Sequence, residues 1–554
     1  MATLHFIPGN QTIIVADGTN LLEVTRSAGV FIASPCDGLG TCGKCRVKIQ
    51  AGQFGNLREA AQEWLTKAER AEGWVLACQS TVQGDLRVEF AQSMDDDLKI
   101  LSEGHDTDVA LAPWITKTLV AARTETVVLA GDAVLAIESG DTMETVYGMA
   151  VDIGTTTLVA ALIDLRDGRE IAVASSLNPQ ARHAQDVLSR IKLGSQVEGL
   201  KQLHGELIAE LNRLIGDAAE QAHIPIHRIY EAVFSGNTTM LHLATGTDPA
   251  SLGKYPYTPA LQCGGHRRAA DIGLVIAPDG LVYLPPIMSA YVGADITSGI
   301  LAAKLTERSG VTLFVDIGTN GEMVLGVNGQ LTATSTAAGP AFEGMNIACG
   351  MRASRGAIEM VSLSGAGVEI KTIADATPVG LCGSGLLDAV GELAAHGGID
   401  KNGRFQTNGA LPEHRWKDRF ESLDGKPVFR IAAAVYLSQK DVRQVQLAKA
   451  AIRAGIELML GANQLTASQV DTVLIAGSFG FHLRTASLIH LGLLPREFKD
   501  RVEFVGNTSK SGARAFLLNH RLRDELKQLV QQVRVLELAN DPAFGKTFVQ
   551  ALSF

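Results

Sequence analysis

Four cysteines near the start of the chain have the type and the spacing of ligands for an iron–sulfur cluster. They are Cys36, Cys42, Cys45 and Cys78, and the first three lie in one glycine-rich loop. Glycine lets a loop curl around an inorganic core, so that backbone N–H groups point at the sulfur atoms. A zinc site is the alternative use of four thiolates, but the wide spacing to Cys78 argues against it. We therefore expect a redox centre at this end of the chain.

Other charged and sulfur-containing residues have simpler interpretations. Lys44 and Arg46 add positive charge beside the cysteine loop, and we interpret both as solvated surface residues. Steering of an acidic redox partner is the alternative role for this charge. Cys263, Cys349 and Cys382 have no partner at ligand spacing, so we expect small buried side chains there.

A second pattern, Asp-Ile-Gly-Thr, occurs twice, at residues 152–155 and 316–319. A tight glycine turn between strands exposes N–H groups to phosphate oxygens, and Thr and Asn side chains add hydrogen bonds. An aspartate at a strand end binds Mg²⁺ directly or through water, and orients an attacking water. The expected catalytic residues are Asp152, Asp316 and Glu322. The expected phosphate-binding residues are Gly154, Thr155, Thr156, Gly318, Thr319 and Asn320.

One copy of this pattern is equally consistent with an ordinary β-hairpin turn, but two copies in corresponding positions favour a nucleotide site. Two further glycine-rich segments support that interpretation. One contains Gly477, Ser478 and Gly480, which offer a flat surface to adenine. The other contains Gly383 and Ser384, at the start of a predicted helix whose N-terminus faces phosphate.

Asp295 and Asn237 are further candidates for the same nucleotide site, with a salt bridge and a turn as their alternative roles. The chain has no Gly-x-x-x-x-Gly-Lys-Ser/Thr loop, so it is not a P-loop protein. The combination of segments resembles the superfamily of actin, sugar kinases, acetate kinase and the large chaperone ATPases. ATP and Mg²⁺ are the cofactors expected at this site.

The elements around these residues predict three parts of the chain. Residues 1–92 have the order of a small ferredoxin, with a hairpin, a helix, the cysteine loop and two strands, so we expect an α+β ferredoxin-like (β-grasp) domain. Residues 93–146 contain an acidic stretch, which we interpret as a solvated linker, with an acidic docking arm as the alternative. A small strand-rich subdomain follows, with strands expected at 126–130 and 133–137.

Residues 147–554 have an α/β pattern with a weak internal repeat. Strand–turn–strand patterns begin at Met149 and again at Leu313, and a long amphipathic helix is expected over about 200–222. We predict a duplicated, RNase H-like ATPase of the actin type, with halves at about 147–305 and 306–554.

Composition excludes several classes of protein. The 554 residues carry a net charge of −10, which argues against nucleic acid as the main partner because phosphate binding needs clustered Lys and Arg. No apolar run reaches the length of a membrane span, and no signal peptide is apparent. An odd number of cysteines, seven, with four in cluster-like spacing, is typical of a reducing cytoplasm.

Several strings spread along the chain make the resemblance more specific, and the resemblance covers nearly the whole chain. The fusion of a ferredoxin to such an ATPase resembles the reductive activators of corrinoid proteins. The shared strings lie at residues 178–180, 186–191, 235–240, 291–296, 338–344 and 506–508. Two features depart from the family: the segment before the ATPase is short, and His183-Ala184 stands where an aromatic–glycine pair is expected.

This resemblance implies an ATP-dependent transfer of one electron from a [2Fe–2S] cluster to the inactive Co(II) corrinoid of a methyltransferase system, which restores Co(I). It also implies a corrinoid protein or corrinoid-dependent methyltransferase as partner, an upstream electron-donor reductase, and a homodimer. One alternative is an ATP-coupled electron donor to a radical or dehydratase-type enzyme. Those activators hold one [4Fe–4S] cluster between two subunits, whereas this chain has four cysteines on one module. A nucleotide-regulated binding or chaperone module with a redox-sensing cluster is the third alternative.

Overall fold

The computed structural model describes residues 1–7, 11–30, 32, 34, 38, 40, 43–56, 64–90, 109–120, 124–406, 416–477 and 483–554. Four residues named above, Cys36, Cys42, Ser478 and Gly480, lie outside the described residues. Within the part of the chain that is described, no helix is long and apolar enough to cross a membrane.

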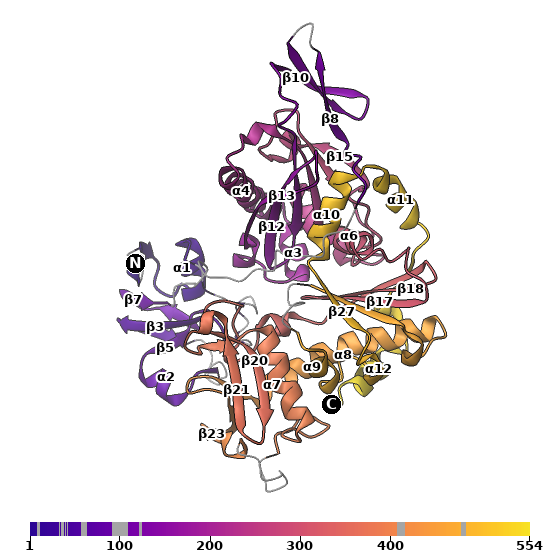
Figure 1. The fold of residues 1–554 in the computed structure, drawn as a ribbon. Helices are drawn as coiled ribbons and strands as arrows, with labels where there is room; N and C mark the ends of the chain where they lie inside the picture. The colour runs from indigo at the N-terminus through magenta and orange to yellow at the C-terminus, as the bar shows by residue number, and fades with distance from the viewer. Residues whose placement is uncertain are drawn as a thin grey trace.

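The N-terminal module contains a five-stranded sheet, a two-stranded sheet and two short helices, as expected for a ferredoxin-like domain (Figure 1). Strand β1 pairs antiparallel with β2 and parallel with β7, and its side chains Leu4 and Phe6 are fully buried. Helix α1 begins at Asn20, whose side chain caps the Leu22 N–H and also donates to the Cys78 carbonyl. The helix cap therefore contacts a predicted cluster ligand directly. The elements are β1 (Ala2–Ile7), β2 (Gln11–Val15), α1 (Leu21–Ser27), β3 (Arg46–Ala51), β4 (Phe54–Asn56), α2 (Lys67–Ala71), β5 (Trp74–Leu76), β6 (Ser80–Val82) and β7 (Leu86–Glu89).

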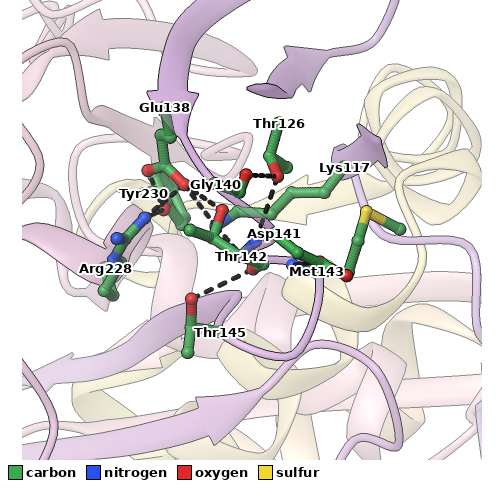
Figure 2. A network of polar contacts seen from close by, with 10 residues as sticks. All are labelled: Lys117, Thr126, Glu138, Gly140, Asp141, Thr142, Met143, Thr145, Arg228 and Tyr230. Atoms are coloured by element: carbon green, nitrogen blue, oxygen red, sulfur yellow. Dashed lines mark hydrogen bonds and ion pairs between the residues drawn. The ribbon is translucent and has the colours of Figure 1, made fainter. Parts of the chain in front are cut away.

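A three-stranded antiparallel sheet, β8 (Ile115–Val120), β9 (Glu125–Ala130) and β10 (Ala133–Ser139), follows and projects at the top of Figure 1. Both strands expected here from the sequence are confirmed, with slightly longer bounds for β10. This small sheet is joined to the ATPase part by a buried polar network (Figure 2).

Glu138 is the centre of that network. Its carboxylate accepts a hydrogen bond from the Lys117 ammonium at 2.8 Å and another from the Tyr230 hydroxyl at 2.5 Å. It also forms an ion pair with Arg228. Burial alone would raise the pKa of Glu138, but the hydrogen bonds from Lys117, Thr142 and Tyr230 outweigh it and lower the pKa to about 2. Tyr230 and Arg228 belong to the ATPase part, so the ionised carboxylate holds the two parts together.

Replacement of Glu138 by Gln is expected to destabilise the protein by about 3 kcal/mol at neutral pH, because it leaves the buried Lys117 ammonium without its counter-ion. Because the folded pKa lies below the ordinary value of 4.5, the stabilisation is present above that pH and is lost as the pH falls towards about 2. Denaturant unfolding at several pH values checks this: wild type and variant should converge in acid. The control is Glu144→Gln, a side chain that is 85% exposed. An equal effect of the two substitutions would contradict the proposed role of Glu138.

The first half of the ATPase part is a six-stranded sheet in the order β13-β12-β11-β14-β16-β15. Helix α4 packs on β12 and β13, and its buried face carries Leu203, Leu207, Leu211 and Leu214, the stripe expected from the sequence. The elements of this half are β11 (Tyr147–Ile153), β12 (Thr157–Asp164), β13 (Glu170–Leu177), α3 (Val187–Gly194), α4 (Val197–Gln221), β14 (Ile229–Gly236), α5 (Thr238–Ala244), β15 (Gly265–Arg268), β16 (Leu281–Leu284) and α6 (Ala294–Ala302).

The second half is a six-stranded sheet in the order β27-β26-β17-β18-β19-β28, with two small sheets and helices around it. Its elements are β17 (Val311–Ile317), β18 (Gly321–Val327), β19 (Gln330–Thr336), β20 (Ala357–Ser364), β21 (Gly367–Thr372), β22 (Gly380–Leu381), α7 (Gly383–Ala395), β23 (Phe420–Leu423), β24 (Lys426–Arg430), β25 (Tyr436–Ser438), α8 (Gln439–Ala462), β26 (Thr472–Ala476), α9 (Thr485–His490), β27 (Val502–Gly506), α10 (Thr508–Leu518), α11 (Arg521–Leu529), β28 (Arg534–Leu536) and α12 (Phe544–Ala551).

The two large sheets repeat one topology, which confirms the duplicated actin-like fold. In each, a strand ending in Asp-Ile pairs antiparallel with the next strand and parallel with a later one: β11 with β12 and β14, and β17 with β18 and β26. Asp152 and Asp316 therefore occupy corresponding ends of corresponding strands.

Helix α10 crosses between the halves. By sequence it belongs to the second half, yet it packs against β11, β14 and α6 of the first (Figure 1). The reason is its apolar face, because Ala513, Phe516 and Leu517 join a buried cluster with Ala150 and Val233 of the first sheet. Helix α10 therefore lies with the first half in space, although it follows the second half in sequence.

Candidate functional site

The two Asp-Ile-Gly-Thr turns face one cavity between the halves, which encloses about 770 Å³ including its open mouth. Ten of the residues expected at a nucleotide site line this cavity. They are Asp152, Gly154, Thr155, Thr156, Asp316, Gly318, Thr319, Asn320, Glu322 and Gly477. Asn237 and Asp295, the further candidates, line it as well.

Both glycines of the paired turns are held by backbone hydrogen bonds. The Gly154 N–H donates to the Thr157 carbonyl at 3.0 Å, and the Gly318 N–H donates to the Asn320 carbonyl at 2.9 Å. A Cβ atom at position 154 would lie 2.6 Å from the Thr157 oxygen, so only glycine fits this turn. At position 477 the backbone has φ +108° and a Cβ would lie 2.4 Å from the Ile317 oxygen, which lets the chain pass close to the second turn.

Four carboxyl groups, Asp152, Asp295, Asp316 and Glu322, line this cavity; Glu322 is buried and the other three are half-buried. Desolvation and the neighbouring acids raise the pKa values of Asp295, Asp316 and Glu322, that of Asp316 to about 7 and that of Asp295 to about 8. Desolvation also raises the pKa of Asp152, but its carboxylate accepts hydrogen bonds from Asn507 at 2.8 Å and from Ser509 at 2.7 Å, which favour the ionised form. Concentrated negative charge of this kind favours a divalent cation.

The donor set fits Mg²⁺ brought in with a nucleotide better than a ready-made metal cage. Within the described ranges, no group of three or more His, Cys, Asp or Glu side chains converges closely enough to hold a metal ion. Mg²⁺ keeps several waters and takes one or two carboxylates together with substrate phosphates. The cavity, with separate acids and two phosphate-type turns, matches that second arrangement.

Sequence reasoning missed several residues of this cavity. Asn507, Thr508 and Ser509 reach it from the start of α10, and the Thr508 hydroxyl is buried without a hydrogen-bond partner among the described residues. Glu343 also lines it, accepting a hydrogen bond from the Thr156 hydroxyl at 2.6 Å and another from Thr319. Residues 507, 508 and 343 were visible only as parts of strings shared with a family, with no chemistry attached.

The structure does not support the expected phosphate contact of Gly383 and Ser384. Neither residue lines the cavity, and the buried Ser384 hydroxyl donates to the Glu359 carbonyl at 2.8 Å. This glycine-rich start of α7 serves packing, since a Cβ at Gly385 would lie 2.1 Å from the Ile358 oxygen. The close approach of α7 to β20 therefore accounts for Gly385 without a ligand.

Arg190 positions the first Asp-Ile-Gly-Thr turn through a hydrogen bond to the backbone of that turn. Its fully buried guanidinium donates to the Thr155 carbonyl at 2.6 Å, to Gln180 at 3.1 Å and to the Ala184 carbonyl at 2.9 Å. Burial lowers the pKa of Arg190 to about 9, and the charges of Asp186 and Glu343 oppose that shift. These bonds orient the N–H groups of the turn towards the cavity.

Replacement of Arg190 by Lys is expected to raise the KM for ATP roughly tenfold with a smaller change in kcat, because a lysine reaches one acceptor instead of three. Steady-state ATPase measurements over a range of ATP concentrations check this. The exposed Arg182, replaced by Lys, is the matched control. A lower unfolding temperature with an unchanged KM would show that Arg190 stabilises the fold without positioning the turn.

In the N-terminal domain, the described cysteines fit a cluster site. Cys45 and Cys78 are buried, the Cys78 N–H points at the Cys45 sulfur at 3.5 Å, and the Gln79 amide points at the Cys78 sulfur at 3.5 Å. N–H groups directed at sulfur are what thiolate ligands of a cluster need. Gly38, Gly40 and Gly43 have φ between +66° and +82°, so the loop uses backbone conformations that other residues rarely adopt.

Three regions of the chain match known families. Residues 5–83 match the 2Fe-2S iron–sulfur cluster binding domain, residues 147–308 match the RACo middle region, and residues 310–554 match the C-terminal domain of RACo, described as the ASKHA domain.

Individual relatives agree with these matches. The chain is 30% identical to the corrinoid activation enzyme RamQ of Eubacterium limosum over 98% of both chains. It is 24% identical to the [Co(II) methylated amine-specific corrinoid protein] reductase of Methanosarcina barkeri, over 74% of this chain and 77% of that one. Among solved structures, a reductive activator for corrinoid, iron-sulfur protein superposes with a TM-score of 0.74 at 32% identity, over 100% of this chain and 98% of the other.

Proposed function

This chain belongs to the reductive activators of corrinoid proteins, and from that premise we propose the reaction that it performs. It transfers one electron from its [2Fe–2S] cluster to the inactive Co(II) corrinoid of a methyltransferase system and so restores Co(I), at the expense of ATP. The observation that carries this proposal is the presence, in one chain, of a buried thiol site in a ferredoxin-like domain and a cavity between two facing phosphate-type turns.

The need for ATP follows from the free energy of the electron transfer. Plant-type [2Fe–2S] centres have potentials near about −400 mV, and the family's reaction implies a lower potential for Co(II)/Co(I). A gap of roughly 200 mV costs about 4.6 kcal/mol for one electron. A nucleotide that binds two conformations with different affinity supplies energy of that size.

Each group in the cavity has a role in this proposal. Asp152 and Asp316 would hold Mg²⁺, which would neutralise phosphate charge, and Glu322 would orient the water that attacks the terminal phosphate. The N–H groups and hydroxyls of the two turns bind the phosphates, and Gly477 borders the base. Cys36, Cys42, Cys45 and Cys78 would hold the cluster, which would supply one electron at a time.

The protein partners follow from the same proposal. A corrinoid protein or corrinoid-dependent methyltransferase accepts the electron, and a separate reductase provides it. We also propose domain limits of 1–92 for the ferredoxin, 93–146 for the linker and middle subdomain, and 147–554 for the ATPase, and a homodimer as the assembly.

Reduction of a corrinoid protein, followed by the visible absorption of Co(II) and Co(I), tests the proposal. With a strong donor to the cluster, Co(I) should form with ATP and Mg²⁺ and should not form without nucleotide. Equal reduction without ATP would overturn the coupling. A four-iron electron paramagnetic resonance spectrum of the reduced protein would overturn the cluster assignment and favour a dehydratase-type activator.

A further inference from the structure

The loop that carries Cys45 contacts the ATPase part through the neighbouring residue. The Lys44 ammonium donates to the Gly350 carbonyl at 3.0 Å and also to the Ile347 carbonyl. The interpretation of Lys44 as a solvated surface residue is therefore wrong. Figure 1 shows the ferredoxin domain beside the part of the second half that contains β20 and β21.

Two more contacts fix the ferredoxin domain on the same part. The Lys440 ammonium lies 4.2 Å from the centre of the Trp64 ring, and the Lys67 N–H donates to the Asp424 carboxylate at 3.0 Å. Lys67 is the first residue of α2, so its N–H has no partner inside the helix. That N–H is therefore a specific reporter of whether the domain is docked.

The segment that holds Lys44 also reaches the nucleotide cavity. Glu343 lies just before Ile347, and its two carboxylate oxygens accept hydrogen bonds from Thr156 of the first turn and Thr319 of the second. One carboxylate thus joins the two turns expected to bind phosphate, and the carbonyls that hold the cluster loop follow within a few residues.

This segment is tightly built, so a displacement at one end reaches the other. Gly344 has φ +77°, and a Cβ at Gly350 would lie 2.1 Å from the Gly344 oxygen, so the chain folds back on itself. The Ala348 N–H donates to Asp441 at 2.8 Å, and the Met351 N–H donates to the Leu381 carbonyl at 2.8 Å. A close-packed loop of this kind moves as a unit.

Phosphate chemistry sets the direction of the movement. Phosphate oxygens accept hydrogen bonds from the same two threonine hydroxyls, and their negative charge repels the Glu343 carboxylate. We propose that Glu343 is a nucleotide-sensing positioning residue: phosphate displaces it from Thr156 and Thr319, and the 343–350 segment shifts and releases Lys44. The cluster loop is then free to meet a partner. This inference rests on the proposed ATP site and adds the route by which the site controls the cluster domain.

Amide hydrogen exchange on the cluster-loaded full chain tests the route. In the wild type, Mg²⁺ with a non-hydrolysable ATP analogue should raise exchange at the Lys67 N–H and in residues 344–351 on the order of tenfold, the effect of losing one charged hydrogen bond. Glu343→Ala should show fast exchange at Lys67 without nucleotide and no further rise with it. Glu343→Gln, which keeps the size of the side chain, should show a partial effect.

Lys44→Met tests the same route at the contact between the cluster loop and the 343–350 segment. It should raise exchange at Lys67 without nucleotide and, because coupling between two sites is reciprocal, it should also raise the affinity for the analogue, measured by calorimetry, by up to about tenfold. Lys48→Gln is the matched control, because that ammonium faces Glu72 at 3.8 Å within the ferredoxin domain. Cluster absorption verifies that each variant is folded and loaded.

The outcomes separate this inference from the proposed function. ATP-dependent corrinoid reduction with no change of exchange at Lys67 would overturn the route and leave the function intact. A response of Glu343→Ala to the analogue equal to that of the wild type would also overturn the route and leave the function intact. Absence of analogue binding in the wild type would overturn the proposed function itself.

Discussion

Asp316→Asn is expected to lower ATP-dependent corrinoid reduction on the order of a thousandfold, while the visible absorption of the [2Fe–2S] cluster stays unchanged. Asparagine has the shape of aspartate but cannot carry the negative charge that attracts Mg²⁺. Asp316 lies half-buried at the end of β17 and lines the cavity with Asp295 and Glu322, so its replacement removes part of the charge that attracts the cation. The measurement is the rate of Co(I) formation at saturating ATP, with ATP hydrolysis followed in parallel.

Asp279→Asn provides the matched control for this experiment. Its side chain is 58% exposed and pairs with Arg268 at 3.4 Å, far less buried than Asp316. The control should reduce the corrinoid at the wild-type rate. Full activity of Asp316→Asn would remove the second turn from the catalytic site and would leave Asp152 as the main magnesium-binding group.

Cys45→Ala should have the opposite signature, with loss of the cluster and of all corrinoid reduction but an ATP affinity within about a factor of two of the wild type. The Cys45 sulfur is buried and receives the Cys78 N–H, so its removal takes away a ligand and leaves that N–H without its acceptor. Iron content, cluster absorption and calorimetric ATP titration measure the three quantities.

Cys263→Ala is the control for loss of a thiol as such. Burial raises the pKa of the Cys263 thiol to about 12, which makes it an unreactive neutral group outside the cluster domain. This variant should keep its iron. A Cys45→Ala protein that still holds a stable [2Fe–2S] cluster would exclude Cys45 from the ligands.

Local patterns predicted much of the fold because they depend on neighbours in sequence. The alternation and the apolar runs located β9, β10, β11 and β17, and the leucine stripe located α4, since each reflects one buried face. The paired Asp-Ile-Gly-Thr turns predicted the cavity for the same reason, because a tight glycine turn between two strands is formed by residues that are neighbours in sequence.

Contacts between distant segments could not be predicted in that way. Asn507 and Ser509 reach Asp152 only because α10 crosses to the first half, and that crossing depends on an apolar face without a unique partner in the sequence. Gly383 and Ser384 show the converse error. A glycine-rich helix start is the same in sequence whether it faces phosphate or a neighbouring strand, and here it faces β20.

The sequence by itself determined the two chemistries of this protein, a four-cysteine site and a duplicated phosphate-binding turn, because each is encoded by residue types at short spacing. Only the tertiary structure decided how these chemistries meet. Lys44 is 303 and 306 residues from its acceptors Ile347 and Gly350 in the chain, and Asp152 is 355 residues from Asn507. Such pairs form when packed apolar faces bring their segments together, and the spacing of residues along the chain carries no record of that packing.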